Sequence, residues 1–130
     1  MSTERPTILV TGGCGYIGTH TITCLLAQNY NVVVVDNLVN SSKISLDAVV
    51  KIAGLTDDER KERLILYEVD IRDETALRKV FESSPTLQAC IHFAGLKVKI
   101  SYPSLSRILY VHYLGANFVS ALYCIASFLP

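Results

Sequence analysis

The sequence has no excess of charge of either sign, since twelve lysines and arginines balance twelve aspartates and glutamates over 130 residues. Non-specific nucleic-acid binding needs a basic face that neutralises phosphates. The balanced charge therefore argues against a nucleic-acid partner. Half of the residues are hydrophobic and 18% are charged, a composition that argues against disorder and predicts one packed domain.

Cysteine is scarce and is not spaced for a metal site. The four cysteines, at positions 14, 24, 90 and 124, form no C-x-x-C pair. This spacing argues against a metal centre or a disulfide framework and favours free thiols in a reducing compartment. Residues 1–6 are polar and show no signal-peptide pattern. We therefore expect a cytoplasmic protein.

Charge is nearly absent from residues 98–130. This segment holds only Lys99 and Arg107, where an average sequence would hold roughly eight charges. Residues 108–129 form 22 uncharged positions, close to the ~20 that cross a bilayer. Because polar residues such as His112 and Asn117 interrupt this stretch, we favour a helix lying on a sheet. A disordered or aggregating tail is the second alternative, and membrane association is the third.

The rest of the sequence alternates short apolar runs with amphipathic segments. The apolar runs predict buried strands at residues 7–10, 32–35, 64–69 and 89–93. Helices are expected at residues 16–28, from Ser41 or Ser42 to Ile52, and from Asp73 onward. The first helix would bury Ile17, Ile22, Cys24, Leu25 and Leu26, and the last would bury Leu77, Val80 and Phe81. Seven consecutive charged residues at 57–63 indicate a solvated helix or loop.

This alternation predicts a parallel sheet with right-handed crossovers. By their position in the chain, the strands are expected in the order 3-2-1-4, which is an incomplete Rossmann-type, doubly wound α/β fold. Residues 1–97 would form the N-terminal part of a dinucleotide-binding domain. Residues 98–130 would form a divergent apolar tail that is helical. The open edge of the fourth strand predicts association into oligomers.

A glycine-rich loop, TGGCGYIG at residues 11–18, connects the first strand to the first helix. It satisfies G-x-G-x-x-G through Gly13, Gly15 and Gly18, and G-x-x-G-x-x-G through Gly12, Gly15 and Gly18. Glycine permits a tight turn and lets the backbone approach a pyrophosphate. The helix that follows offers its first N–H groups and its positive dipole end to phosphates. The loop therefore predicts a dinucleotide site.

An acidic residue stands where such a site needs one. Asp36 closes the second strand, 18 residues after Gly18, in position to accept hydrogen bonds from an adenosine ribose. Its charge repels a 2′-phosphate, and no arginine adjoins it, because Asn37 and Leu38 follow. The sequence therefore favours NAD over NADP.

Several nearby residues have two interpretations. Cys14 is either a thiol activated by the helix N-terminus or, as we favour, a small side chain that fills a tight loop. We interpret His92 as a core histidine rather than a catalyst. Tyr16 and Ile17 are expected to pack beneath the cofactor.

Four segments closely resemble the UDP-glucose (UDP-galactose) 4-epimerases, which are extended short-chain dehydrogenase/reductases of galactose metabolism. These segments are residues 11–18, 35–42, 69–71 and 91–97, and the resemblance spans about residues 7–97. The glycine motif is shared by the whole superfamily. The sequences DNLVNS and HFAGLK are more specific to the 4-epimerases, and they weigh against a sugar-nucleotide dehydratase or decarboxylase.

The resemblance implies cofactor-binding roles for residues of four loops, namely Gly12, Gly15, Tyr16, Ile17, Gly18, Asp36, Asn37, Leu38, Asn40, Ser41, Asp70, Ile71, Phe93, Ala94, Gly95 and Lys97. Residues 36–41 would surround the adenosine ribose, and Asp70 and Ile71 would flank the adenine. Residues 93–97 would line the stretch from pyrophosphate to nicotinamide, with Lys97 supplying positive charge. Each has a structural alternative: Phe93 is also a plausible core residue, and Asp70 could cap the next turn.

In the family, bound NAD⁺ takes a hydride from C4 of UDP-glucose or UDP-galactose and returns it to the other face. A tyrosine, with a lysine four residues later, removes the 4-hydroxyl proton. No tyrosine in this sequence has a lysine four residues later, and the likeness is expected to end after Lys97. We therefore expect an NAD-binding chain of the epimerase type that has no catalytic residue, no substrate domain and no activity by itself, with an alternative C-terminus. The second interpretation is a non-catalytic module whose partner is a second copy or a full-length epimerase.

Overall fold

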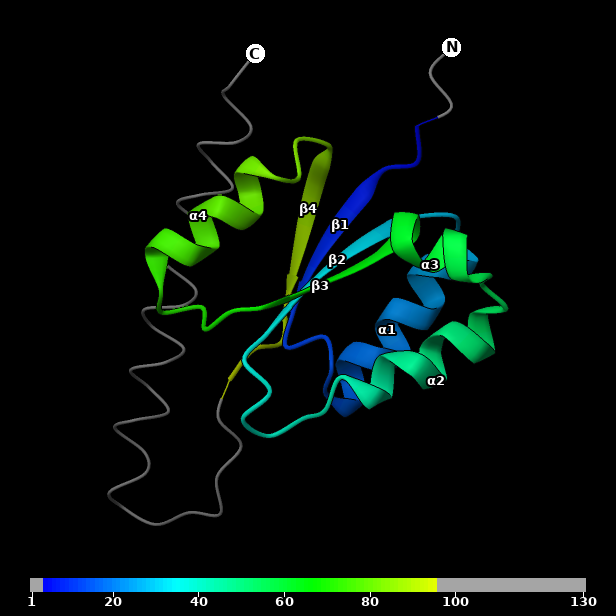
Figure 1. The fold of residues 1–130 in the computed structure, drawn as a ribbon, viewed down its shortest axis with the longest axis horizontal. Coiled ribbons are helices and arrows are strands. Elements are labelled where there is room, and N and C mark those ends of the chain that lie inside the picture. The colour runs from blue at the N-terminus through cyan, green and yellow to red at the C-terminus, as the bar shows by residue number, and fades with distance from the viewer. Residues whose placement is uncertain (1–3, 96–130) are drawn as a thin grey trace.

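Four parallel strands form the centre of the molecule in a computed structural model that describes residues 4–95 (Figure 1). They are β1 (Thr7–Thr11), β2 (Asn31–Asp36), β3 (Leu64–Glu68) and β4 (Leu87–His92). The sheet order is β3-β2-β1-β4 and every pairing is parallel, which confirms the expected 3-2-1-4 arrangement. The apolar tail at residues 98–130 lies outside the described residues.

Burial on both faces explains the continuous apolar runs. All five residues of β1 are buried, because this strand lies between β2 and β4. Along β2, Val32 and Val34 face one hydrophobic cluster, whereas Val33 and Val35 face a second one. A strand with two buried faces reads as an unbroken apolar run rather than as an alternation.

Helices cover the two faces unequally. They are α1 (Tyr16–Ala27), α2 (Ile44–Ala53), α3 (Asp57–Arg63) and α4 (Glu74–Glu82). Helices α1, α2 and α3 lie on one side of the sheet, and α4 lies on the other (Figure 1). Leu77, Val80 and Phe81 of α4 are buried against the second cluster, as the sequence predicts.

The buried stripe of α1 differs from the prediction. Gly18, Ile22 and Leu26 are its buried residues, at a spacing of four. Ile17 and Cys24 were expected on this face, but Ile17 is 57% exposed and Cys24 is also exposed. The prediction was wrong for these two, because a helix turns about 100° per residue. Ile17, five residues before Ile22, and Cys24, two residues after it, therefore both fall on the side of the helix opposite Ile22.

The start of α2 also differs from the prediction. The residue before the helix is Lys43, with no capping hydrogen bond from its side chain, so neither Ser41 nor Ser42 occupies the cap. The Ser42 hydroxyl still accepts a hydrogen bond from the Ile44 N–H at 3.3 Å. The helix ends at Gly54, which has the left-handed conformation.

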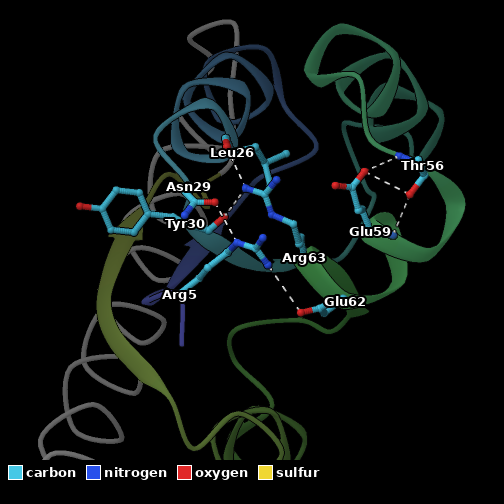
Figure 2. A network of polar contacts seen from close by, with 8 residues as sticks. All are labelled: Arg5, Leu26, Asn29, Tyr30, Thr56, Glu59, Glu62 and Arg63. Carbon is cyan, nitrogen blue, oxygen red and sulfur yellow. Dashed lines mark hydrogen bonds and ion pairs between the residues drawn. The ribbon is translucent and has the colours of Figure 1, made fainter. Parts of the chain in front are cut away.

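The charged run at 57–63 forms α3, whose start is fixed by a capping box. The Thr56 N–H donates to Glu59 Oε2 at 2.9 Å, and the Glu59 N–H donates to Thr56 Oγ1 at 3.3 Å (Figure 2). Both bonds satisfy donors that a helix N-terminus leaves free, and the hydrogen bonds that the Glu59 carboxylate accepts from the Thr56 N–H and hydroxyl lower the pKa of Glu59. The capping box explains why this polar stretch is a helix rather than a loop.

The C-terminal end of α1 is held by arginines (Figure 2). Arg63 is only 8% exposed, and its Nη2 donates to the Leu26 carbonyl at 2.8 Å and to the Tyr30 carbonyl at 3.2 Å. Arg5 Nε donates to Asn29 Oδ1 at 2.8 Å. Guanidinium groups satisfy the carbonyls at this end and match the negative end of the helix dipole. Helix α1 is therefore anchored at the end opposite the glycine loop.

Candidate functional site

The glycine loop begins where β1 ends, and the chain leaving β4 passes directly against it. The Gly12 N–H donates to the Val35 carbonyl at 2.7 Å, and Gly12 has a φ of +67°. A Cβ at Gly12 would lie 2.7 Å from the Ala94 nitrogen and 2.8 Å from the carbonyl carbon of Phe93. The fold itself therefore requires glycine at this position.

The other two glycines of the G-x-x-G-x-x-G pattern have different roles. A Cβ at Gly18 would lie 2.5 Å from the Gly12 carbonyl oxygen, so Gly18 lets α1 pack against the loop. At Gly15 the nearest atom to a Cβ is the Gly12 oxygen at 3.4 Å, and φ is −76°. The described fold therefore does not require glycine at position 15. Because Gly15 lines a cleft, its missing side chain leaves room for a ligand at the loop.

The N-terminus of α1 is left uncapped beside this loop. No side chain caps the helix, and its first turn contains no acidic residue. By contrast, Thr56 caps α3 and Asp73 caps α4 through their side chains. The first N–H groups of a helix lack intrahelical partners and carry its positive dipole end. Tyr16 and Ile17, in this first turn, are 74% and 57% exposed.

Asp36 ties the loops around the cleft together. Its carboxylate accepts hydrogen bonds from the Cys14 N–H at 3.0 Å, the Leu38 N–H at 2.9 Å and the Ser41 hydroxyl at 2.9 Å. Only the Cys14 bond goes to Oδ2, and a carboxylate oxygen has about two acceptor sites. Asp36 thus fixes the glycine loop and retains capacity to accept a hydrogen bond from a ligand.

Cys14 lies within the glycine loop, and His92 is the last residue of β4. Burial, together with the nearby charge of Asp36, raises the pKa of the Cys14 thiol to about 11. This result supports the interpretation of Cys14 as a filler of the tight loop. His92 Nδ1 lies 2.6 Å from Thr11 Oγ1, which supports its interpretation as a core histidine.

Asp70, which also lines the cleft, forms a closely bound pair with Arg72. Arg72 Nε donates to Asp70 Oδ1 at 2.9 Å, and Nη2 donates to Oδ2 at 2.6 Å. The Arg72 N–H also donates to Oδ1 at 2.9 Å, and Asn37 Nδ2 donates to Oδ2 at 3.3 Å. These hydrogen bonds, those of Arg72 first, hold the pKa of Asp70 well below its usual range. Asp70 thus connects the loop after β2 to the loop after β3.

These loops enclose a cleft of about 150 Å³ at the carboxyl ends of the strands. Eleven of the sixteen residues expected at the cofactor line it, namely Gly12, Gly15, Asp36, Asn37, Asn40, Ser41, Asp70, Ile71, Phe93, Ala94 and Gly95. Tyr16, Ile17, Gly18 and Leu38 are not among the lining residues, and Lys97 lies outside the described residues. Residues that form the lining but were not expected there are Val35, Val39, Val69 and Arg72.

Arg72 is the most informative of these additions. Val35 of β2 and Val69, which directly follows β3, carry no polar chemistry that a sequence could reveal. Arg72, however, follows Asp70 at a spacing of two, and this D-x-R spacing could have indicated a local ion pair.

Within residues 4–95, no three or more His, Cys, Asp or Glu side chains gather as they would to hold a metal ion. None of the helices in this part of the chain has the length and hydrophobicity of a membrane-spanning segment.

Comparison with known proteins gives a consistent set of relatives. Residues 8–117 match the model of the NAD dependent epimerase/dehydratase family. UDP-glucose 4-epimerase 2 of Arabidopsis thaliana is 53% identical over 90 residues, which are 69% of this chain and 24% of that protein. The UDP-glucose 4-epimerase of Yersinia enterocolitica is 52% identical over 90 residues, with the same two coverages of 69% and 24%.

Solved structures agree in fold. The UDP-glucose 4-epimerase of Bifidobacterium longum, crystallised in complex with NAD+ and UDP, aligns with a TM-score of 0.81 at 34% identity. The alignment covers 93% of this chain and 34% of that one. The chain thus spans about a quarter of the length of the curated relatives it matches. The family match extends beyond Lys97 to residue 117, and the domain boundary at residue 97 stays a prediction.

Proposed function

The chain belongs to the NAD dependent epimerase/dehydratase family, and from this premise we propose that its cleft binds the adenosine and pyrophosphate part of NAD. One observation carries the proposal: the uncapped N-terminus of α1 and the carboxylate of Asp36 lie at the same cleft. Gly15, which precedes the first residue of α1, and Asp36 both line it. The helix end attracts phosphate and the carboxylate accepts ribose hydroxyls, so the two features together match one nucleotide.

The lining residues fit this group. Gly15 presents no side chain to the phosphates, and the chain leaving β4 lies directly against Gly12. The cleft has a volume of about 150 Å³. A complete pocket for a small molecule usually has a volume of at least ~300 Å³. Lys97, expected near the nicotinamide, lies outside the described residues.

The proposal assigns one role to the Asp36 side chain and another to the backbone of α1. Asp36 accepts hydrogen bonds from the ribose hydroxyls, and its charge disfavours a 2′-phosphate. The first-turn N–H groups of α1 bind the pyrophosphate. Bound NAD supplies a hydride acceptor for the family's chemistry. No step of that chemistry is assigned to a residue of this chain.

The family reaction, interconversion of UDP-glucose and UDP-galactose, requires groups that this sequence lacks. None of its seven tyrosines has a lysine four residues later. We therefore propose that the 130-residue chain binds NAD in the cytoplasm but does not epimerise UDP-sugars by itself. The names of the relatives support UDP-glucose as a substrate of the longer enzymes that the chain resembles.

Calorimetric titration of the purified chain with NAD⁺ tests the proposal. We expect saturable binding, and a loss of at least about ten-fold in affinity for Gly15→Ala, because its methyl group would stand where the phosphates approach. Gly54→Ala is the matched control, since Gly54 does not line the cleft and no atom lies within 4 Å of the position of its Cβ. No binding at millimolar NAD⁺ would contradict the proposal. Equal affinities of the Gly15→Ala variant and the wild-type chain for NAD⁺ would also contradict it.

A second candidate function is pairing with another epimerase chain. It is favoured by β4, which is the last strand of the sheet and whose outer edge pairs with no strand among residues 4–95. An unpaired strand edge is a template for association. Epimerisation of UDP-galactose is measured for the chain alone and for its mixture with a full-length epimerase. Activity of the chain alone would contradict the first proposal, and an unchanged rate and sedimentation profile of the mixture would contradict the second.

A further inference from the structure

The charged residues that line the cleft affect whether it can bind a dinucleotide that carries a 2′-phosphate. Among the described lining residues the charged ones are Asp36, Asp70 and Arg72, so Arg72 is the one cation. A dinucleotide with a 2′-phosphate needs a cation near the ribose, and arginine usually provides it. The direction in which Arg72 points therefore decides whether the cleft can accept that phosphate.

We infer that Asp70 is a positioning residue that sets cofactor specificity: it holds the Arg72 guanidinium by a two-point contact and so withholds this cation from a ribose 2′-phosphate. The inference rests on the proposed binding of NAD and adds to it a cause of selectivity separate from Asp36. Asp36 repels the extra phosphate directly, whereas Asp70 acts through Arg72.

The contact between the two side chains has the geometry that this role needs. Nε and Nη2 of Arg72 each donate to a different oxygen of Asp70, at 2.9 Å and 2.6 Å. Paired, parallel hydrogen bonds between guanidinium and carboxylate are among the strongest in proteins. The two side chains are only partly exposed, at 38% and 29%. The positive charge of Arg72 is thus compensated before any ligand arrives.

The pair is also close to the part of the cleft where a ribose would bind. Asn37 directly follows Asp36, and its side-chain amide donates to Asp70 Oδ2 at 3.3 Å. Asp70 and the residue next to Asp36 are therefore in contact at the cleft. Removal of the Asp70 carboxylate would take this counter-ion away from Arg72, close to the residues expected at the ribose.

A substitution at Asp70 can remove its negative charge while it keeps the turn that Asp70 begins. Asp70 accepts a hydrogen bond from the Arg72 N–H through Oδ1, and its own carbonyl accepts one from the Asp73 N–H at 2.9 Å. Asparagine forms the same turn through its side-chain oxygen. Asp70→Asn therefore keeps the turn and removes the counter-ion.

The test compares the ratio of NADP⁺ to NAD⁺ affinity in the wild-type chain, Asp70→Asn, Arg72→Gln and the double variant, by calorimetry. We expect Asp70→Asn to raise the relative affinity for NADP⁺ by about ten-fold, since one charge-assisted contact to phosphate is gained. The double variant should return to the wild-type ratio, and Arg72→Gln alone should not favour NADP⁺. AMP and adenosine 2′,5′-bisphosphate, which differ only in the 2′-phosphate, should show the same order.

The outcomes separate the two levels of the proposal. If the wild-type chain does not bind NAD⁺, the proposed function fails, and the inference fails with it. If NAD⁺ binds but Asp70→Asn leaves the ratio unchanged, or the double variant keeps the gain, only the role of Asp70 is refuted. Thermal melts check that each variant is folded. Asp70→Ser, which also supports the turn, replaces the asparagine variant if that one does not fold.

Discussion

Replacement of Gly12 by alanine should destabilise the fold by an amount that the structure allows to be worked out. Alanine at a φ of +67° costs about 1–2 kcal/mol relative to glycine. The new methyl group would also lie 2.7–2.9 Å from three backbone atoms of Phe93 and Ala94, which no change of rotamer can move away. Forcing such a shift costs about 1–3 kcal/mol, so we expect a total loss of about 2–5 kcal/mol in the free energy of unfolding.

Two matched variants separate these contributions. Gly54 has the same φ of +67°, with no atom within 4 Å of a Cβ, so Gly54→Ala carries the backbone cost alone. Gly15→Ala carries neither, because its φ is −76° and its nearest contact is 3.4 Å, so its stability should stay within about 0.5 kcal/mol of wild type. Urea unfolding followed by far-UV circular dichroism measures all three. Equal losses for the Gly12 and Gly54 variants would show that the chain leaving β4 does not pack on the glycine loop.

The folded chain should lose part of its stability in acid through Asp70, because a lowered pKa stabilises the fold fully above the unfolded value of about 4 and this contribution disappears as pH falls below it. Urea titrations should therefore show a shallower acid decline for Asp70→Asn than for wild type, and parallel declines would contradict this role. Cys24 is exposed and should react with iodoacetamide at about pH 8 well before Cys14 and Cys90, whose pKa values burial raises to about 11. Peptide mapping by mass spectrometry measures the order, and equal rates would argue that the thiols are not buried. Arg63→Ala should lower the free energy of unfolding by about 2–4 kcal/mol, because the carbonyls of Leu26 and Tyr30 each lose the hydrogen bond from Arg63, and a urea midpoint unchanged from wild type would refute this anchor.

The sheet could be predicted because its determinants are local and repeated. The run of four valines at 32–35 has no polar alternation, and only a strand buried on both faces produces this pattern. The glycine loop and Asp36 then locate the carboxyl edge of the sheet, where eleven expected residues line the cleft. Strand order follows from the handedness of the crossovers rather than from any single residue.

Other features depend on competition that a sequence does not display. Ile17 is apolar but exposed, because α1 is oriented by Gly18 packing on the loop and by Ile22 in the core. Ser41 has the right chemistry for a helix cap, yet its hydroxyl donates to Asp36 instead. The D-x-R spacing indicates the ion pair of Arg72 with Asp70, but it does not indicate that Arg72 lines the cleft, which depends on how the loops fold.

The segment between β2 and β3 is fastened at both of its ends. Near its start, the Ser45 hydroxyl donates to the Cys14 carbonyl at 2.9 Å, and at its end Arg63 binds the last turn of α1. No residue between Ser41 and Val69 lines the cleft, and the surroundings of Gly54 are open. A peptide tag or fluorescent reporter inserted at Gly54 would therefore move together with the domain and leave the affinity for a nucleotide unchanged. Gly54 is thus a suitable position for attaching a label, because it does not belong to the cleft that the label would be used to study.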